Sequence, residues 1–216
     1  MTPRDLVTWI EGHQAILTRT VGEHVVLSAV ALAAIVSIGV PLGIALTRWR
    51  RAETPVLVLV TTLRAVPSLA LLAVMLPVLG TGFLPSAIAL AIYGLPAVLL
   101  NTHTGLREVA PEIVEAGRGQ GFSERQILLR IAIPLALPVI FAGVRTAAVQ
   151  VVSAATLAVF IGGGGLGELI SAGMGLLDIP QLVVGAFTVA TLALLTELLF
   201  GAAERAAAAA VGSSRA

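Results

Sequence analysis

The sequence predicts an all-α polytopic membrane protein with five transmembrane helices, for two reasons. Hydrophobic residues make up 57% of the 216-residue chain and charged residues only 12%, whereas soluble domains carry about 25% charged residues. The apolar residues also gather in segments of about 20 residues or more, the length that crosses a bilayer as a helix. The predicted spans are residues 25–47, 55–79, 86–105, 131–160 and 180–200, within one transmembrane domain of residues 23–203.

The N-terminal segment, residues 1–22, precedes the first span. Its charged residues leave no apolar core of the length that a cleavable signal peptide needs. Apolar and aromatic residues recur at helical spacing, which predicts an amphipathic helix lying in the membrane interface. A frayed polar leader is the alternative. The residues that carry the spacing are Leu6, Trp9, Ile10, His13, Ile16 and Leu17.

The second predicted span contains a charge, Arg64, and a proline, Pro67, which Ser68 follows. An intramembrane charge costs at least about 2.5 kcal/mol on insertion scales, so it normally faces a partner or a water-filled path. Arg64 therefore either lines a translocation path or forms a structural ion pair. Pro67 leaves a backbone carbonyl without an amide partner. Such carbonyls either line a polar pathway or lie at a kink where neighbouring helices supply the hydrogen bonds.

The fourth predicted span contains Arg145, for which the same two interpretations apply. Glu197 is the only acidic residue within a predicted span and is the candidate ion-pair partner for either arginine. A glycine run, residues 162–165, opens an irregular loop that continues to about Pro180. The run is either a flexible turn or a backbone that approaches closely where two subunits meet, and its position at the outer end of the fourth span suggests a gate-like role.

A polar stretch, residues 107–130, separates the third and fourth spans. Pro111 and Glu112 suit the first turn of a short helix, and three glycines end it. Ser123 with Gln126 three residues later reads as a capping box that opens a second helix. The stretch therefore predicts a helix, a glycine break and another helix. The glycines are Gly117, Gly119 and Gly121.

Arginines predict the orientation of the chain. They occur after the first span, in the 107–130 loop and in the tail, residues 204–216, whereas the other two loops carry Glu168 and Asp178. By the positive-inside rule, the 107–130 loop is cytoplasmic and the N-terminus lies outside. The loop arginines are Arg48, Arg50, Arg51, Arg107, Arg118, Arg125, Arg130, Arg205 and Arg215.

Several kinds of site have no support in the sequence. The chain has no cysteine, which excludes thiolate metal sites and cysteine nucleophiles. His13, His24 and His103 show no metal-ligand spacing, so we predict no metal site. The net charge of +1 gives no argument for nucleic acid. An intramembrane enzyme and a structural subunit without a transport role remain as remote alternatives.

The 107–130 loop and the start of the fourth span resemble the coupling signature of ATP-binding cassette (ABC) importer permeases. That family pattern is Glu-Ala-Ala, three residues, Gly, nine residues, Ile-x-Leu-Pro. Glu115-Ala116-Gly117, Gly121 and Ile131-Ala132-Ile133-Pro134 stand at the same spacing, with glycine for the second alanine and isoleucine for leucine as the two departures. Residues 67–72, 137–147 and 155–167 further resemble permeases for quaternary-ammonium osmoprotectants.

The resemblance implies a methionine-importer-type permease fold in the bacterial cytoplasmic (inner) membrane. It implies cytosolic ATPase subunits that use ATP, a separate extracytoplasmic substrate-binding protein, and a second permease, either another copy or a related chain. No cofactor is expected on the chain itself, and membrane lipid surrounds it. The expected substrate is glycine betaine, choline, carnitine or a similar amine. The alternative is another small solute, such as methionine, a sulfonate or a phosphonate.

The resemblance also assigns expected roles to residues. The ATPase-coupling residues are Glu115, Ala116, Gly117, Arg118, Gly121, Phe122, Ile131 and Pro134. The residue chemistry described above and the resemblance together give the candidates for the translocation path or gate: Arg64, Pro67, Ser68, Arg145, Thr156, Phe160, Gly162 and Gly165. Arg145 falls within the family pattern, whereas Arg64 does not.

Overall fold

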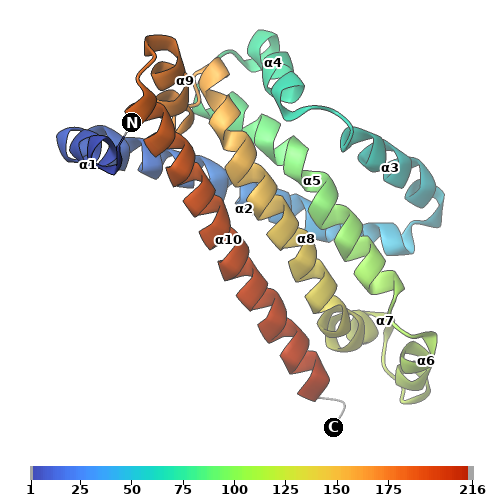
Figure 1. Cartoon of the computed structure of the whole chain (residues 1–216). Helices are drawn as coiled ribbons and strands as arrows, with labels where there is room; N and C mark the ends of the chain where they lie inside the picture. Colours follow the sequence, from blue (N-terminus) through green and yellow to red (C-terminus); the bar gives the residue numbers. More distant parts are fainter. Residues whose placement is uncertain (1, 214–216) are drawn as a thin grey trace.

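A computed structural model describes residues 2–213, so Arg215 of the tail lies outside the described residues. The described chain consists of helices joined by short turns (Figure 1). In order they are α1 (Pro3–Gly12), α2 (Gln14–Arg48), α3 (Arg50–Leu63), α4 (Ser68–Leu79), α5 (Phe83–Arg107), α6 (Pro111–Gly119), α7 (Glu124–Ile127), the π-helical turn η1 (Leu128–Ala132), α8 (Ile133–Ala154), the 3₁₀ segment η2 (Ala155–Ile161), α9 (Gly167–Leu176) and α10 (Ile179–Ser213).

Four helical segments in the described chain are long and apolar enough to cross a membrane: α2, α5, the continuous stretch from α7 to η2, and α10. The predicted span 55–79 is instead two helices, α3 and α4, bent by 99° at their break. Pro67 explains the break, because proline has no amide to donate and pushes the residue before it out of the helical region. If the bent pair counts as one span, the number of spans is five.

The fourth predicted span, residues 131–160, begins earlier than expected because α7 runs into it through η1. The π-turn comes just before Pro134. A proline ring would collide with the carbonyl four residues earlier in a regular α-helix, and the wider turn makes room for it. From α7 onward, the coupling loop and the fourth span are therefore one continuous helical path.

Three other segments differ from the predicted boundaries. Residues 14–22 belong to α2 rather than to a separate interfacial segment, and only α1 stands apart from it. The 162–180 loop contains a helix, α9, after its glycine run. The tail from residue 204 continues α10 as far as Ser213, because its alanines have the highest helix propensity.

The centre of the bundle is formed by α2, α5 and α8, which pack closely on one another. Its fully buried side chains include Leu27, Ile35, Leu90, Val98 and Val151. Glycines at the crossings let the backbones approach, as expected for helices that associate in lipid. A Cβ added to Gly43 of α2 would lie 2.9 Å from the Leu99 carbonyl oxygen of α5.

The two ends of the bundle differ in character. The hairpin of α6 and α7 lies at the same end as the C-terminus, whereas α4 and α9 lie at the opposite end (Figure 1). Sequence-distant elements meet at each end. The polar hairpin thus projects from one end, and the glycine run lies at the other.

Candidate coupling hairpin and transport path

The polar hairpin is closed by a Schellman motif at the end of α6. The Phe122 amide donates to the Gly117 carbonyl (3.1 Å) and the Gly121 amide donates to the Arg118 carbonyl (2.9 Å), which is the hydrogen-bond pattern of that motif. Gly121 has φ +84°, a left-handed conformation that side chains disfavour. Gly121 therefore sets the direction in which the chain leaves α6.

The second helix of the hairpin begins with the capping box expected from the sequence. The Ser123 amide donates to Gln126 Oε1 (2.8 Å), and the Gln126 amide donates to Ser123 Oγ (3.3 Å). These reciprocal bonds satisfy amides that a helix start leaves free. The predicted order of helix, glycine break and helix is confirmed.

Arg118 joins the two helices of the hairpin. Its Nη1 donates to Glu115 Oε1 (2.6 Å) and its Nε donates to Glu124 Oε1 (2.8 Å). The hydrogen bonds that Arg118 donates to Glu124 and then to Glu115 hold the pKa of its guanidinium well above its usual range. Because all three side chains are exposed to water, the stabilisation is small, and the main consequence is a fixed angle between α6 and α7.

Gly117 packs against the start of the fourth span. A Cβ added there would lie 2.8 Å from Ile131 Cδ1, so the absence of a methyl group lets Ile131 approach α6. The opposite face of α6 is open, and Glu115 and Ala116 lie on it. The coupling residues therefore form two groups. Gly117, Ile131, Phe122 and Pro134 are buried or half-buried, whereas Glu115 and Ala116 are exposed.

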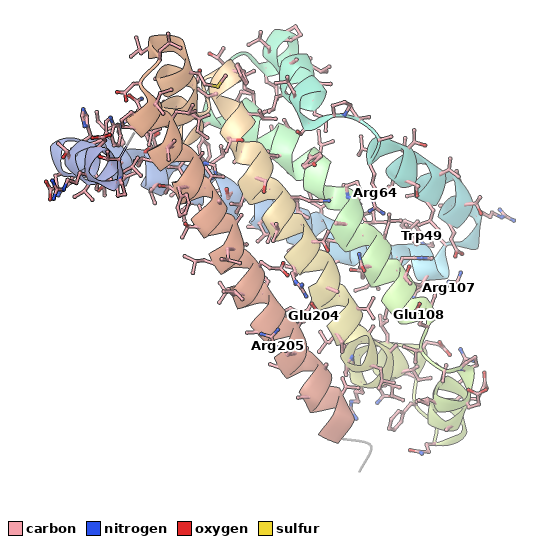
Figure 2. The ribbon with its side chains drawn as sticks, in the orientation of Figure 1. Trp49, Arg64, Arg107, Glu108, Glu204 and Arg205 are labelled. Atoms are coloured by element: carbon pink, nitrogen blue, oxygen red, sulfur yellow. The ribbon has the colours of Figure 1, made fainter. Side chains whose placement is uncertain are left out.

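A polar cluster joins the base of the hairpin to α3. Glu53 of α3 accepts a hydrogen bond from Arg107 at the end of α5, and its Oε1 lies 3.1 Å from His103 Nε2. Arg107 lies at the lower end of α5, beside Glu108 and close to the hairpin (Figure 2). The cluster therefore ties α3 to the residues that lead into α6.

Arg145 is paired within the chain. Its Nη1 donates to Glu204 Oε2 (2.9 Å) and its Nη2 donates to Glu197 Oε1, so α8 is joined to α10. A cavity of about 440 Å³ adjoins the three side chains. This geometry supports the structural interpretation of Arg145, because both of its terminal nitrogens are occupied.

Arg64 lies at the end of α3, beside the break (Figure 2). Its side chain is exposed, and no carboxylate among the described residues forms an ion pair with it. Pro67 and Ser68 follow at the start of α4. Glu197 thus pairs with Arg145 rather than with Arg64, and the two arginines lie on different parts of the bundle, because α3 packs on α2 and α5.

One face of α8 and η2 is polar and only partly covered. Thr146 and Ser153 are exposed, Gln150 and Thr156 are half-buried, and Phe160 is 64% exposed at the end of the row. Polar side chains in a membrane helix normally face a water-filled cavity or a protein partner. We call this row the α8 polar face, and it ends at the glycine loop, residues 162–165.

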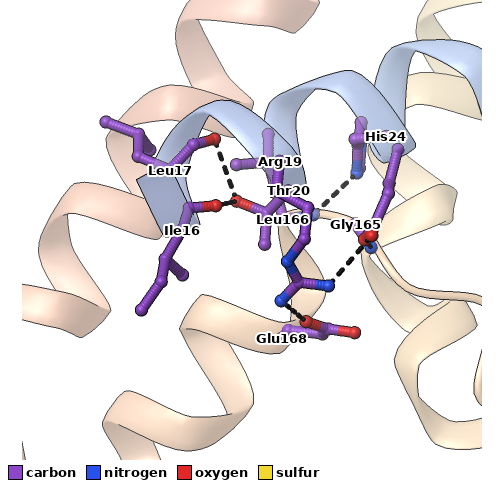
Figure 3. A network of polar contacts seen from close by, with 9 residues as sticks. Ile16, Leu17, Arg19, Thr20, His24, Gly165, Leu166 and Glu168 are labelled. Atoms are coloured by element: carbon purple, nitrogen blue, oxygen red, sulfur yellow. Dashed lines mark hydrogen bonds and ion pairs between the residues drawn. The ribbon is translucent and has the colours of Figure 1, made fainter. Parts of the chain in front are cut away.

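The glycine loop is fastened to α2 (Figure 3). Glu23 and His24 of α2 accept hydrogen bonds from the backbone amides of Gly165 and Leu166. On the other side, the Gly82 amide of the α4–α5 turn donates to the Ile161 carbonyl (2.7 Å). The loop is therefore closely fitted rather than a free turn.

Sequence reasoning missed the partners in these contacts. Glu23 and Glu53 lie outside the predicted spans, and Glu204 lies beyond the predicted end of the fifth span. The sequence signal for Glu204 is its spacing of seven from Glu197, which puts both on one face of a helix if the helix continues. No described group of three histidine or acidic side chains is arranged to hold a metal ion.

The described chain is thus a bundle of apolar helices with a structured polar hairpin at one end. The fold is similar to a solved structure titled "Inward facing conformations of the MetNI methionine ABC transporter", with a TM-score of 0.81, 22% identity, and coverage of 91% of this chain and 98% of that chain. It is also similar to one titled "Crystal structure of an amino acid ABC transporter with histidines", with a TM-score of 0.78, 18% identity and coverage of 95% and 99%.

The chain belongs to the family of binding-protein-dependent transport system inner membrane components, which it matches over residues 39–208. It is 36% identical to the glycine betaine/carnitine/choline transport system permease protein OpuCB of Bacillus subtilis (93% of this chain, 92% of that protein). It is 40% identical to the carnitine transport permease protein OpuCB of Listeria monocytogenes (92% and 91%) and 38% identical to the osmoprotectant import permease protein OsmW of Salmonella typhimurium (90% and 93%).

Family membership fixes the class of protein. The chain is the permease subunit of an ABC transporter, a multi-pass protein of the bacterial inner membrane, and a separate ATPase subunit hydrolyses the ATP. Such permeases work together with a substrate-binding protein. Transport is therefore favoured over the intramembrane enzyme and the structural subunit without a transport role.

Proposed function

We propose that this chain is the translocating subunit of an importer for quaternary-ammonium osmoprotectants such as glycine betaine, carnitine or choline. The observation that carries the proposal is the set of relatives named for these solutes, each of which aligns with nine-tenths of the chain or more. The substrate-binding protein is a separate chain on the outer side. The second permease is a copy of this chain or a related one.

In the proposed mechanism, the exposed face of α6 docks on the cytosolic ATPase. Glu115 and Ala116 lie on that face, and the Schellman motif and Arg118 fix the angle of α6 to the fourth span. Closure of the ATPases pushes on α6, and the push passes through the contact of Gly117 with Ile131 and the Arg118–Glu124 ion pair into η1 and α8. The α8 polar face lines the route, with Thr156 and Phe160 near its outer end.

The orientation follows from the arginines. The hairpin, the turn between α2 and α3 and the C-terminal part of α10 are on the cytoplasmic side, and α1, α4 and α9 are on the outer side. Amphipathic α1 then lies in the lipid–water interface on the outer side of the inner membrane. Its Thr2 amide donates to Asp5 Oδ2 (2.6 Å), and this bond lowers the pKa of the Asp5 carboxyl.

Gly121→Leu tests the coupling role. Leucine at φ +84° is strained by roughly 1–2 kcal/mol, so the hairpin is expected to change shape while the helical bundle stays folded. We expect normal amounts of the variant in the membrane, with at least about a tenfold loss of co-purified ATPase and of uptake. Uptake is measured in vesicles with radiolabelled glycine betaine, with the transporter's own ATPase and binding protein present.

Gly175→Leu is the matched control, because Gly175 is helical, has open space around it and lies at the opposite end of the molecule. It should leave co-purification and uptake unchanged. If Gly121→Leu retains both its ATPase and normal uptake, α6 is not the coupling element.

One observation favours a second substrate class. Arg64 has no ion-pair partner among the described residues, and an unpaired guanidinium on the route would repel choline and attract an anionic group. An importer of methionine, a sulfonate or a phosphonate is the corresponding alternative. Uptake of each labelled solute in turn separates the two: uptake of glycine betaine, carnitine or choline supports our proposal, and uptake only of methionine, a sulfonate or a phosphonate overturns the substrate assignment.

A further inference from the structure

The glycine loop makes an unusual pair of contacts with α2. Two consecutive backbone amides, of Gly165 and Leu166, donate to two consecutive side chains, Glu23 Oε2 (3.0 Å) and His24 Nδ1 (3.3 Å). Irregular backbone at membrane depth is tolerated only where its polar groups are satisfied by protein or by water. The amides of Gly162 and Gly163 bond back to η2, so α2 supplies the partners that the loop cannot find in its own segment.

His24 links three elements at once. Its side chain is fully buried, and its Nε2 lies 2.9 Å from the Val152 carbonyl oxygen in the last turns of α8. Because an amide can only donate, Nδ1 is the acceptor for Leu166, and the proton therefore sits on Nε2 and is donated to Val152. One neutral histidine thus connects α2, α8 and the loop.

Glu23 extends the attachment to the helix after the loop. Its Oε1 accepts from Arg19 Nη1 (2.9 Å), and Arg19 Nη2 donates to Glu168 Oε2 (2.8 Å) in the first turn of α9. The close-up view shows Arg19 reaching from α2 to Glu168 and the amides of Gly165 and Leu166 facing α2 (Figure 3). Both the loop and the helix that follows it are therefore held by one turn of α2.

The glycine at position 165 is required by this contact. Its φ is +86°, and an added Cβ would lie 3.1 Å from His24 Nδ1. A cavity of about 450 Å³ adjoins the contact and is lined by Glu23, Phe83, Glu168 and the first three glycines of the loop. The loop therefore lines this outer cavity and begins two residues after Phe160, where the α8 polar face ends.

We propose that Glu23 and His24 are positioning residues for the glycine loop, and that their hydrogen bonds to Gly165 and Leu166 hold the outer end of the transport route closed. The inference rests on the proposed transport function and deepens it. An outward opening that separates the loop from α2 must break both bonds. The two side chains then set how readily the outer end opens.

The test uses a reporter at Ser86 of α5, which is fully buried and lies against Gly163 of the loop. Because the chain has no cysteine, Ser86→Cys supplies the only thiol. The reporter chain is assembled with its ATPase and binding protein, and labelling by a membrane-impermeant maleimide added from outside is timed without ATP. Glu23→Ala and His24→Leu are expected to raise the labelling rate roughly tenfold, since each removes a hydrogen bond that closes the loop.

Matched controls and a conservative variant identify the cause. Glu11→Ala and His13→Leu remove the same side-chain types nearby, away from the loop, and should label at the parent rate. Glu23→Gln keeps an oxygen that can accept from Gly165, so it should label more slowly than Glu23→Ala. Glu23→Ala should keep its co-purified ATPase, because the loop contact lies at the opposite end of the molecule from the hairpin.

Two outcomes are distinguished. If Glu23→Ala folds, keeps its ATPase and labels at the parent rate, the positioning role is wrong and the transport function stands. If the parent neither binds the ATPase nor takes up substrate, the proposed function itself fails. If His24→Leu does not accumulate in the membrane, Glu23→Ala with its Gln counterpart decides the question alone.

Discussion

At the scale of single residues, Arg145 shows how position and partner together determine a role. A guanidinium partway along α8 would be costly beside lipid, yet it lies between two carboxylates of α10. The same residue type at position 64 has no such partner among the described residues. The ion pairs of Arg145 therefore join α8 to α10. Arg64, at the break between α3 and α4, is instead an exposed charge.

Arg145→Met is expected to destabilise the protein because it leaves Glu197 and Glu204 facing each other. Removing one partner of a shielded ion pair is more harmful than removing both. We expect the melting temperature in detergent to fall by roughly 5 °C. Combining Arg145→Met with Glu197→Gln and Glu204→Gln should recover most of the loss, and equal losses in the single and triple variants would contradict the structural role.

At the scale of helices, the crossing of α2 and α5 depends on close backbone contact. A methyl group on Gly43 would lie 2.7 Å from Thr102 Cβ and 2.9 Å from a carbonyl oxygen, and backbone cannot move aside as a flexible side-chain end can. Gly43→Ala is therefore expected to cost about 1–3 kcal/mol through overpacking. Thermal melting of the purified subunit measures the change.

Gly22 of the same helix provides the control, because nothing lies within 4 Å of an added Cβ there. Gly22→Ala should be neutral or stabilising by roughly 0.5–1 kcal/mol, since alanine is the better helix former. A stable Gly43→Ala variant would mean that the crossing is looser than its geometry indicates.

The elements that could be predicted from the sequence are those with local rules. The hairpin followed from Gly121, Ser123 and Gln126, because caps and left-handed turns are chosen by residues within a few positions. A kink at Pro67 was one of the two sequence interpretations, but the size of the bend between α3 and α4 was not predicted. A proline shows where a helix breaks, but the 99° angle depends on what the two halves pack against.

The candidate site divides in the same way. The spacing from Glu115 to Pro134 identified the hairpin, whereas the attachment of the glycine loop joins residues 142 positions apart. Neither Glu23 nor His24 has a local signal, because an acid and a histidine just before a predicted span can take many roles. Contacts of this kind become visible only when the fold brings the two segments together.

At the scale of the whole molecule, the described chain has a polar hairpin at one end and a fitted glycine loop at the other. η1 and α8 connect the two without a break, and α2 reaches from the loop to the arginine-rich turn before α3. A displacement of the hairpin is therefore transmitted along α8 to the segment that Glu23 and His24 hold. This arrangement allows a push on one end to alter closure at the other.

The orientation of the molecule is the last prediction. Arginine-rich loops are retained on the cytoplasmic side during insertion, so a single thiol in the hairpin should be reachable only from inside the cell. In this cysteine-free chain, Ser123→Cys should react with an impermeant maleimide in inside-out vesicles and be protected in intact spheroplasts. Gly175→Cys, in the loop region at the opposite end, should show the reverse, and permeabilised membranes should label both. Labelling of Ser123→Cys in intact spheroplasts would invert the topology and remove α6 from the reach of a cytosolic ATPase.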